Sequence, residues 1–98
     1  MNLSKDLVDE IILISEKHDY IYKVVLFGSR AREDNEPKSD IDLAIYSNCD
    51  IFEFIEEIEN TTHTLLEFDF SEMNKIKDDF FREQIEKDGV LLYEKCRI

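Results

Sequence analysis

Two aspartates two positions apart, Asp40 and Asp42, interrupt an apolar segment that reads DIDLAIY. If this segment is a β-strand, alternate residues point to the same face, so the two residues lie about 6.5–7 Å apart on one side of it. Like charges placed there repel each other and lose hydration unless a cation neutralises them. With Asp69 of the segment LLEFDF on an adjacent strand, the pattern predicts a three-carboxylate site for a divalent cation.

Carboxylate oxygens are the ligands that Mg²⁺ prefers, and this ion usually binds through one or two of them together with waters and substrate phosphates. A pair of such ions activates an attacking hydroxyl and stabilises the leaving oxygen in an in-line phosphoryl displacement. The aspartates therefore indicate phosphoryl transfer with Mg²⁺. A lone D-x-D pair would equally fit a loop cap or an ion pair with Arg30, so the interpretation depends on the residues around it.

A Gly-Ser pair, Gly28 and Ser29, follows the apolar run YKVVLF and precedes the two aspartates by a short polar loop. Glycine lets a backbone turn tightly and approach a ligand, and free N–H groups at the start of the next segment suit an anionic phosphate. Arg30 or Arg32 would add a charge-assisted hydrogen bond to the same group. By itself such a pair is usually only a turn. Together with D-x-D it predicts a cradle for a metal-bound polyphosphate.

Helices are predicted where apolar residues recur at the spacing of a helical face. Ser4 is the expected N-cap of the first helix, and Asp50 with Glu53 reads as a variant capping box for the third. In the last helix, Phe80 and Phe81 are expected to point inward. The predicted helical ranges are 4–18, 29–32, 50–60 and 74–87.

Strands are predicted where β-rich residues form short apolar runs or alternate with polar ones. The predicted strand ranges are 22–27, 40–46, 65–70 and 90–93. In the second strand the alternation places Asp40 and Asp42 on one face and the intervening apolar residues on the other. Helices and strands that alternate in this order predict an α/β domain of two layers, in which helices pack against one small mixed sheet.

The composition limits the partners and the location of the chain. Its 98 residues include 24 acidic and 12 basic side chains, a formal net charge of -12, which argues against a nucleic-acid backbone and favours a cation or a basic protein surface. The length predicts a single domain over residues 1–98. Cys49 and Cys96 lack CxxC spacing, and no apolar run suits a membrane span or signal peptide, so we expect a cytoplasmic protein. His18 and His63 have no evident carboxylate partner and are expected at the surface.

The segments GSRAR and SDIDLAI resemble the signature of the minimal nucleotidyltransferases of the DNA polymerase β superfamily, in which Gly-Ser is followed by D-x-D and a later Asp. The segment EFDFSEM is similar to the strand that carries the later Asp, and FREQIEKDGVLLY to the closing helix and strand. The resemblance implies a polymerase-β-like nucleotidyltransferase fold. It also implies that Asp40, Asp42 and Asp69 bind metal and act in catalysis, and that Gly28 and Ser29 contact the nucleotide phosphates.

The same resemblance implies a partner. Family members of this size are often antitoxins of an all-helical HEPN ribonuclease toxin, which they neutralise by transferring AMP from ATP to a tyrosine. We therefore expect an antitoxin that acts as a protein adenylyltransferase dependent on ATP and Mg²⁺. Glu33 stands where the family commonly has Gly, which favours an alternative, a binding module that blocks the toxin by contact alone. Nucleotidyl transfer to tRNA is disfavoured by the acidic charge. Apolar residues on the first or last helix would serve a partner or an oligomer.

Overall fold

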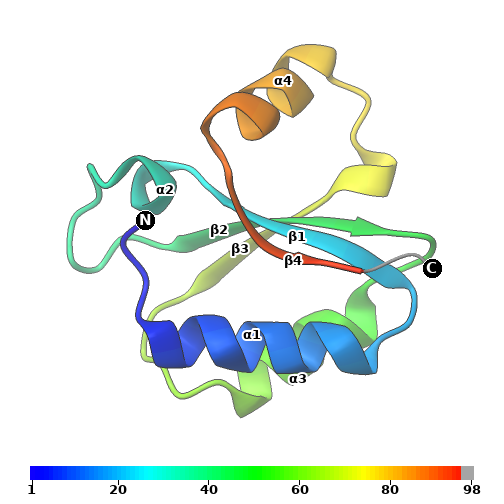
Figure 1. Ribbon diagram of the computed structural model, residues 1–98, viewed down its shortest axis with the longest axis horizontal. Helices are drawn as coiled ribbons and strands as arrows, with labels where there is room; N and C mark the ends of the chain where they lie inside the picture. The colour runs from blue at the N-terminus through cyan, green and yellow to red at the C-terminus, as the bar shows by residue number, and fades with distance from the viewer. Residues whose placement is uncertain (96–98) are drawn as a thin grey trace.

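The computed structural model describes residues 1–95 and contains a four-stranded sheet with helices on both faces (Figure 1). The prediction of an α/β fold with helices packed on a small mixed sheet is confirmed. The elements in chain order are α1 (Lys5–Lys17), β1 (Ile21–Phe27), α2 (Ser29–Arg32), β2 (Ile41–Ser47), α3 (Phe52–Thr61), β3 (Phe68–Glu72), the 3₁₀ helix η1 (Met73–Lys75), α4 (Asp79–Asp88) and β4 (Val90–Glu94).

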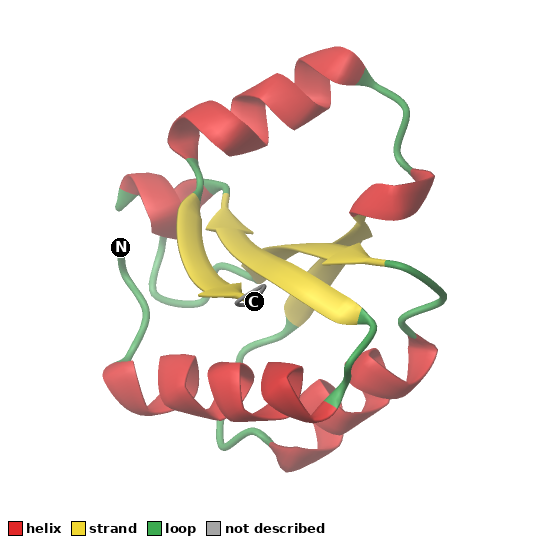
Figure 2. Cartoon of the chain, turned by 45° about the vertical axis from the view of Figure 1, so that its right-hand side comes forward, coloured by secondary structure: helices red, strands yellow, loops and turns green. Residues whose placement is uncertain are grey.

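The strands lie in the order β3-β2-β1-β4. Strand β1 is antiparallel to both of its neighbours, whereas β2 and β3 are parallel. Parallel neighbours need a crossover connection, and α3 supplies it. Helices α1 and α3 lie together on one face of the sheet, and α4 stands over the other face (Figures 1 and 2).

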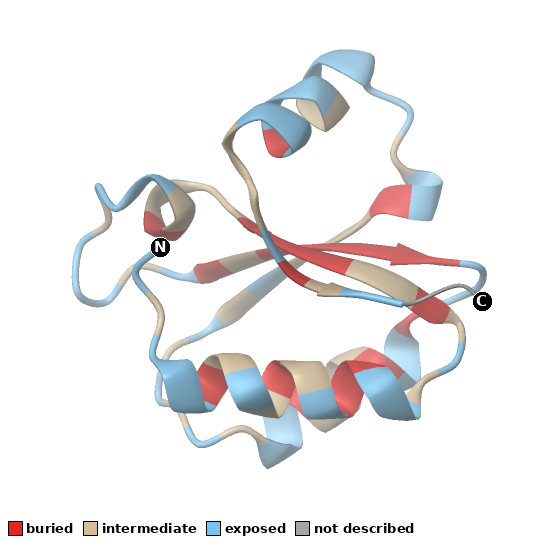
Figure 3. Ribbon diagram, viewed as in Figure 1, coloured by how far each residue is buried: buried red, intermediate tan, exposed pale blue. Residues whose placement is uncertain are grey.

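The main core fills the space between the sheet and the helices α1 and α3. Strand β2 shows how the sequence directs its two faces. Ile41, Leu43 and Ile45 are fully buried in this core, while Ala44 and Tyr46 join a smaller cluster on the face toward α4. The predicted alternation of β2 is therefore confirmed. Strands β1 and β2 are mostly buried, whereas α4 is mostly exposed (Figure 3).

The helix boundaries follow local capping chemistry more closely than apolar spacing. The Ser4 hydroxyl accepts a hydrogen bond from the Leu7 N–H at 3.2 Å, so the predicted N-cap is confirmed. The predicted capping box at Asp50 is wrong, because α3 has Ile51 at its N-cap without a side-chain hydrogen bond. The last helix begins later than predicted, because the Asp78 carboxylate accepts from the first N–H groups of α4 and ends the irregular segment before it.

One of the two phenylalanines predicted to point inward from the last helix does not do so. Phe80 is 71% exposed instead of pointing inward, and only its neighbour Phe81 packs toward the sheet. No helix among the described residues is long and apolar enough to cross a membrane. Cys49 is a free thiol, and Cys96 lies outside the described residues.

Phe54 provides a test of the main core, because its side chain is 0% exposed and packs edge-to-face against Phe70. We expect Phe54→Ala to lower the free energy of unfolding by about 3–5 kcal/mol, the range for truncating a buried phenylalanine. Urea denaturation followed by circular dichroism measures this change. Phe52→Ala is the matched control in the same helix, since Phe52 is 62% exposed and should change stability little. Equal losses in both variants would contradict the packing described.

Candidate active site

The predicted carboxylates gather at one end of β2 and β3, on the sheet face toward α4. Asp42 is half-buried in β2, and Asp69 is its partner in the parallel register with β3. Paired residues on adjacent strands point to the same face. Asp40 is exposed immediately before β2. On the other side of Asp42, Phe27 is its partner in β1, so Asp42 lies between an aromatic residue and a second carboxylate.

Gly28 brings its backbone directly against the Asp42 carboxylate. Its φ is 76°, in the left-handed region that side chains rarely adopt, and a Cβ built there would lie 2.3 Å from Asp42 Oδ2. Both the turn and the close approach therefore require glycine. The turn at the end of β1 and the acidic residue of β2 form one compact unit.

The electrostatics of Asp42 are those of an uncompensated anion. Burial raises the pKa of its carboxyl group above the usual value, and the negative charges of Asp69 and Asp40 raise it further, while Arg32 opposes the shift. The pKa of a carboxyl group is raised in this way when its negative charge lacks a sufficient counter-charge. A divalent cation that prefers oxygen ligands would supply one, so the donor set fits Mg²⁺.

The carboxylates do not form a finished ligand set. Within residues 1–95, no three His, Cys, Asp or Glu side chains lie close enough together to hold an ion. Asp42 is half-buried against the backbone of Gly28, whereas Asp40 and Asp69 are exposed and have rotamer freedom. Repulsion among three anions also favours separation of their side chains when no cation is present. A metal site here requires Asp40 and Asp69 to turn toward Asp42.

Ser29 begins α2 directly after the glycine turn. Its carbonyl accepts from the Asp34 N–H at 3.0 Å. Its half-buried hydroxyl has no hydrogen-bond partner among the side-chain bonds of the described residues. The hydroxyl is thus free to meet a ligand at the turn, where the sequence predicts a phosphate contact.

Arg30 does not lie in the site, which corrects the prediction that it binds the nucleotide. Its side chain is buried, with 5% exposure, and within residues 1–95 its guanidinium donates only to backbone carbonyls. The acceptors are Ser39 at 2.9 and 3.1 Å, Pro37 at 3.1 Å and Asn2 at 3.1 Å. Arg30 therefore holds the loop that leads into β2, and through this loop it helps to position the aspartates. Sequence spacing alone could not separate this role from phosphate binding.

Arg32 is the arginine on the ligand side of the turn. Its side chain is 50% exposed and donates to the Asp34 carboxylate at 3.2 Å. Its positive charge opposes the rise in the pKa of Asp42. Glu33 follows it with φ 68°, a left-handed conformation that explains why glycine suits this position. The Glu33 carboxylate pairs with the amino group of Met1, and this hydrogen bond lowers the pKa of Glu33.

A small cavity of about 190 Å³ opens between the glycine turn and α4. Phe27 and Phe81 meet edge-to-face in its wall, with ring centroids 5.6 Å apart. Gly28, Arg32 and Gln84 add polar groups to the lining. The cavity continues the site from the carboxylates toward α4, a contribution that the sequence did not reveal.

Comparisons with known proteins show the family and the fold of the chain. Residues 9–98 match the family described as polymerase beta, nucleotidyltransferase. A toxin–antitoxin crystal structure with AMP-PNP superposes with a TM-score of 0.70 at 16% identity, covering 95% of this chain and 75% of that chain. A mutant of the toxin–antitoxin MntA–HpeT also gives 0.70 at 16% identity, covering 90% and 73%.

A third structure, a candidate nucleotidyltransferase from Sulfolobus solfataricus, superposes with a TM-score of 0.56 at 22% identity and covers 91% of this chain and 78% of that chain. At these identities the structural likeness shows a shared fold. Among curated proteins, none matches the sequence.

The raised pKa of Asp42 gives a test that needs no substrate. A carboxyl group whose folded pKa lies above its unfolded value destabilises the folded state when ionised, and this penalty vanishes as pH falls below the unfolded pKa. We therefore expect Asp42→Asn to be more stable than the natural protein at neutral pH, and the gain to shrink in acid. Thermal unfolding across this pH range measures it.

Glu94→Gln is the control, since Glu94 is an exposed carboxylate at the last position of β4. Mg²⁺ should raise the melting temperature of the natural protein and of Glu94→Gln more than that of Asp42→Asn. A destabilised Asp42→Asn variant at neutral pH would contradict the electrostatics described here.

Proposed function

This chain belongs to the polymerase beta nucleotidyltransferase family, and on that premise we propose that it transfers AMP from Mg-ATP to a tyrosine hydroxyl of a HEPN-type ribonuclease toxin. The transfer would neutralise the toxin, so the chain would act as its antitoxin. The observation that carries the proposal is the register of Asp42 with Asp69, directly beside the backbone of Gly28. The fold shared with toxin–antitoxin structures, one of them containing AMP-PNP, supports the partner and the nucleotide.

The residues of the chain would divide the work between the two ends of the polyphosphate. Mg²⁺ held by Asp40, Asp42 and Asp69 would neutralise phosphate charge and polarise the reacting phosphoryl group. The backbone at Gly28 and the free hydroxyl of Ser29 would bind phosphate oxygens from the other side. Arg32, the exposed cation near Asp42, would replace Arg30 as the basic contact.

The proposed chemistry is a substitution at the α-phosphorus of ATP. The acceptor oxygen forms a new bond to this phosphorus while the bond to pyrophosphate breaks. The proton of the attacking hydroxyl goes to a carboxylate, and we assign this role to Asp69, which is exposed in the first half of β3. Half-buried Asp42 remains fixed beside Gly28 and orients the reacting group.

A second function is favoured by two observations. The carboxylates are not gathered into a complete ligand set within residues 1–95, and Glu33 adds a negative charge where the family commonly has glycine. Both fit a binding module that neutralises a HEPN toxin by contact alone. The net charge of -12 suits a basic protein partner in either case and disfavours transfer to tRNA.

The test is a transfer assay with labelled ATP, Mg²⁺ and the product of the neighbouring gene. We expect label on a tyrosine of the partner, identified by mass spectrometry. Asp42→Asn and Asp69→Asn should each lower the rate by on the order of 100-fold or more, the scale seen when a group that stabilises a transition state is removed. Glu94→Gln, remote from the carboxylates, should transfer at the natural rate.

A toxicity assay in cells separates the two functions. If transfer neutralises the toxin, Asp42→Asn loses both labelling and protection. If Asp42→Asn still protects while labelling nothing, the binding module is correct and the transferase proposal fails.

A further inference from the structure

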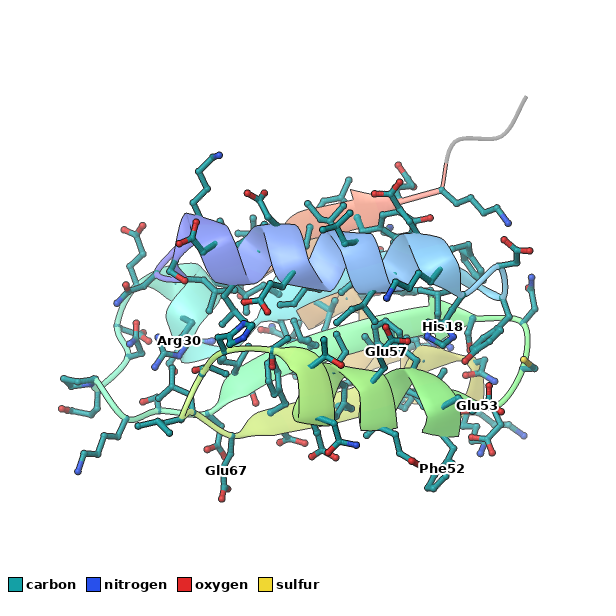
Figure 4. All side chains as sticks on the ribbon, turned by 90° about the horizontal axis from the view of Figure 1, so that it is seen from below. His18, Arg30, Phe52, Glu53, Glu57 and Glu67 are labelled. Atoms are coloured by element: carbon teal, nitrogen blue, oxygen red, sulfur yellow. The ribbon has the colours of Figure 1, made fainter. Side chains whose placement is uncertain are left out.

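We propose that a second pocket, at the opposite end of the sheet from the carboxylates, binds an arginine side chain of a partner protein. This arginine pocket is lined by Tyr20, Cys49, Asp50, Phe52 and Glu53 and has a volume of about 320 Å³. Tyr20 precedes β1, whereas Gly28 follows it. Figure 4 shows the same separation, with Arg30 at one end and Phe52 with Glu53 at the other.

Aromatic rings give the pocket two surfaces on which a planar cation can stack. Phe52 is 62% exposed at the first position of α3, although burying it in the core would be favourable for a residue of this size. Tyr20 contributes the second ring. A guanidinium group over such a ring is attracted by the electrons of its face and can stack flat against it.

The negative charges of the pocket have no cationic partner within residues 1–95. Among the described residues, neither Asp50 nor Glu53 forms an ion pair, and no lysine or arginine lines the pocket. Burial raises the pKa of the Tyr20 phenol and the negative charge of Glu53 raises it further, which fits a carboxylate close to the Tyr20 ring. Two unpaired carboxylates beside exposed aromatic surface favour a cationic occupant and oppose an anionic one such as a nucleotide.

Hydrogen bonds hold the Tyr20 wall in place before any ligand arrives. The Tyr20 hydroxyl lies 3.0 Å from His18 Nδ1, and His18 Nε2 lies 2.9 Å from Glu57 Oε1. The His18 side chain is only 13% exposed, and Lys17 also bonds Glu57 at 2.9 Å. The sequence prediction that His18 and His63 lack carboxylate partners is therefore wrong, since His63 Nδ1 also lies 3.0 Å from Glu10 Oε2. This chain of contacts fixes the ring, which reduces the entropy lost on binding.

The geometry favours arginine over lysine and over an apolar side chain. Arginine combines a flat face for Phe52 and Tyr20 with several N–H donors for the two carboxylates, whereas an ammonium is a strongly hydrated point charge. An apolar side chain would bury Asp50 and Glu53 without a partner, which is costly. Tyrosine and arginine are enriched among the residues that carry most of the binding energy of protein interfaces. The inference does not depend on nucleotidyl transfer, because no residue of the carboxylate site takes part.

Nuclear magnetic resonance titration with small peptides tests the pocket directly. The probes are acetyl-Gly-Arg-Gly-amide, its lysine counterpart and a citrulline counterpart that keeps the shape of arginine without its charge. We expect the arginine peptide to give saturable shifts at Tyr20, Phe52 and Glu53, weakened by added salt. The citrulline peptide should give none, and the lysine peptide should bind more weakly.

Two variants assign the binding to the ring and to the charge. Phe52→Ala and Glu53→Gln should each weaken the arginine peptide by about threefold, the scale of an exposed cation–π contact or ion pair. The matched controls are Phe80→Ala, which removes a ring that is 71% exposed on α4, and Glu83→Gln, which removes an exposed charge there. Both should bind as the natural protein does.

Three results would overturn the proposal. They are an absence of saturable shifts at these residues, equal binding by the citrulline or lysine peptide, and equal weakening by the α4 controls. Circular dichroism verifies that each variant is folded, and Glu53→Gln keeps the test valid if Phe52→Ala is unstable. Because the titration contains no ATP, its failure would leave the transferase proposal standing, and a failed transfer assay would leave the arginine pocket standing.

Discussion

The central constraint on this molecule is one negative charge held where it is poorly compensated. Asp42 lies partly buried in a strand, beside the backbone of Gly28 on one side and Asp69 on the other. The fold stabilises this arrangement with the apolar residues of β2 that face the opposite way, because Ile41, Leu43 and Ile45 anchor the strand in the main core. The free energy gained by burying these apolar residues thus offsets the local cost of the Asp42 charge, which does not itself stabilise the fold.

The topology determines which charges meet. Because α3 carries the chain back along the sheet, β3 runs parallel to β2, and Asp69 comes into register with Asp42 although 26 positions separate them in the sequence. An antiparallel hairpin would have brought neighbouring residues together instead. Helix α4 on the other face of the sheet is mostly exposed (Figure 3), and the candidate site residues Asp42 and Asp69 lie on that face. One face of β2 is therefore buried in the main core, and the other carries the carboxylate of the candidate site.

Sequence reasoning succeeded where a residue's role depends on local periodicity. Alternation predicted the two faces of β2, and the position of Ser4 predicted the start of α1. It failed where a role depends on contacts with distant segments. Nothing in the segment GSRAR distinguishes Arg30, whose donors reach three backbone carbonyls, from Arg32, which stays exposed. The partnership of His18 with Glu57 is equally hidden, since it joins two helices that are close only in the folded chain.

The buried guanidinium of Arg30 also limits how this chain can vary in length. It reaches Pro37 and Ser39 in the connection between α2 and β2, and it reaches Asn2 from the opposite direction. Adding or removing a residue in that connection would carry one of these carbonyls out of range and leave a buried cation unsatisfied. Surface connections normally tolerate insertions well. Here the reach of the Arg30 side chain sets the number of residues between the glycine turn and the first aspartate.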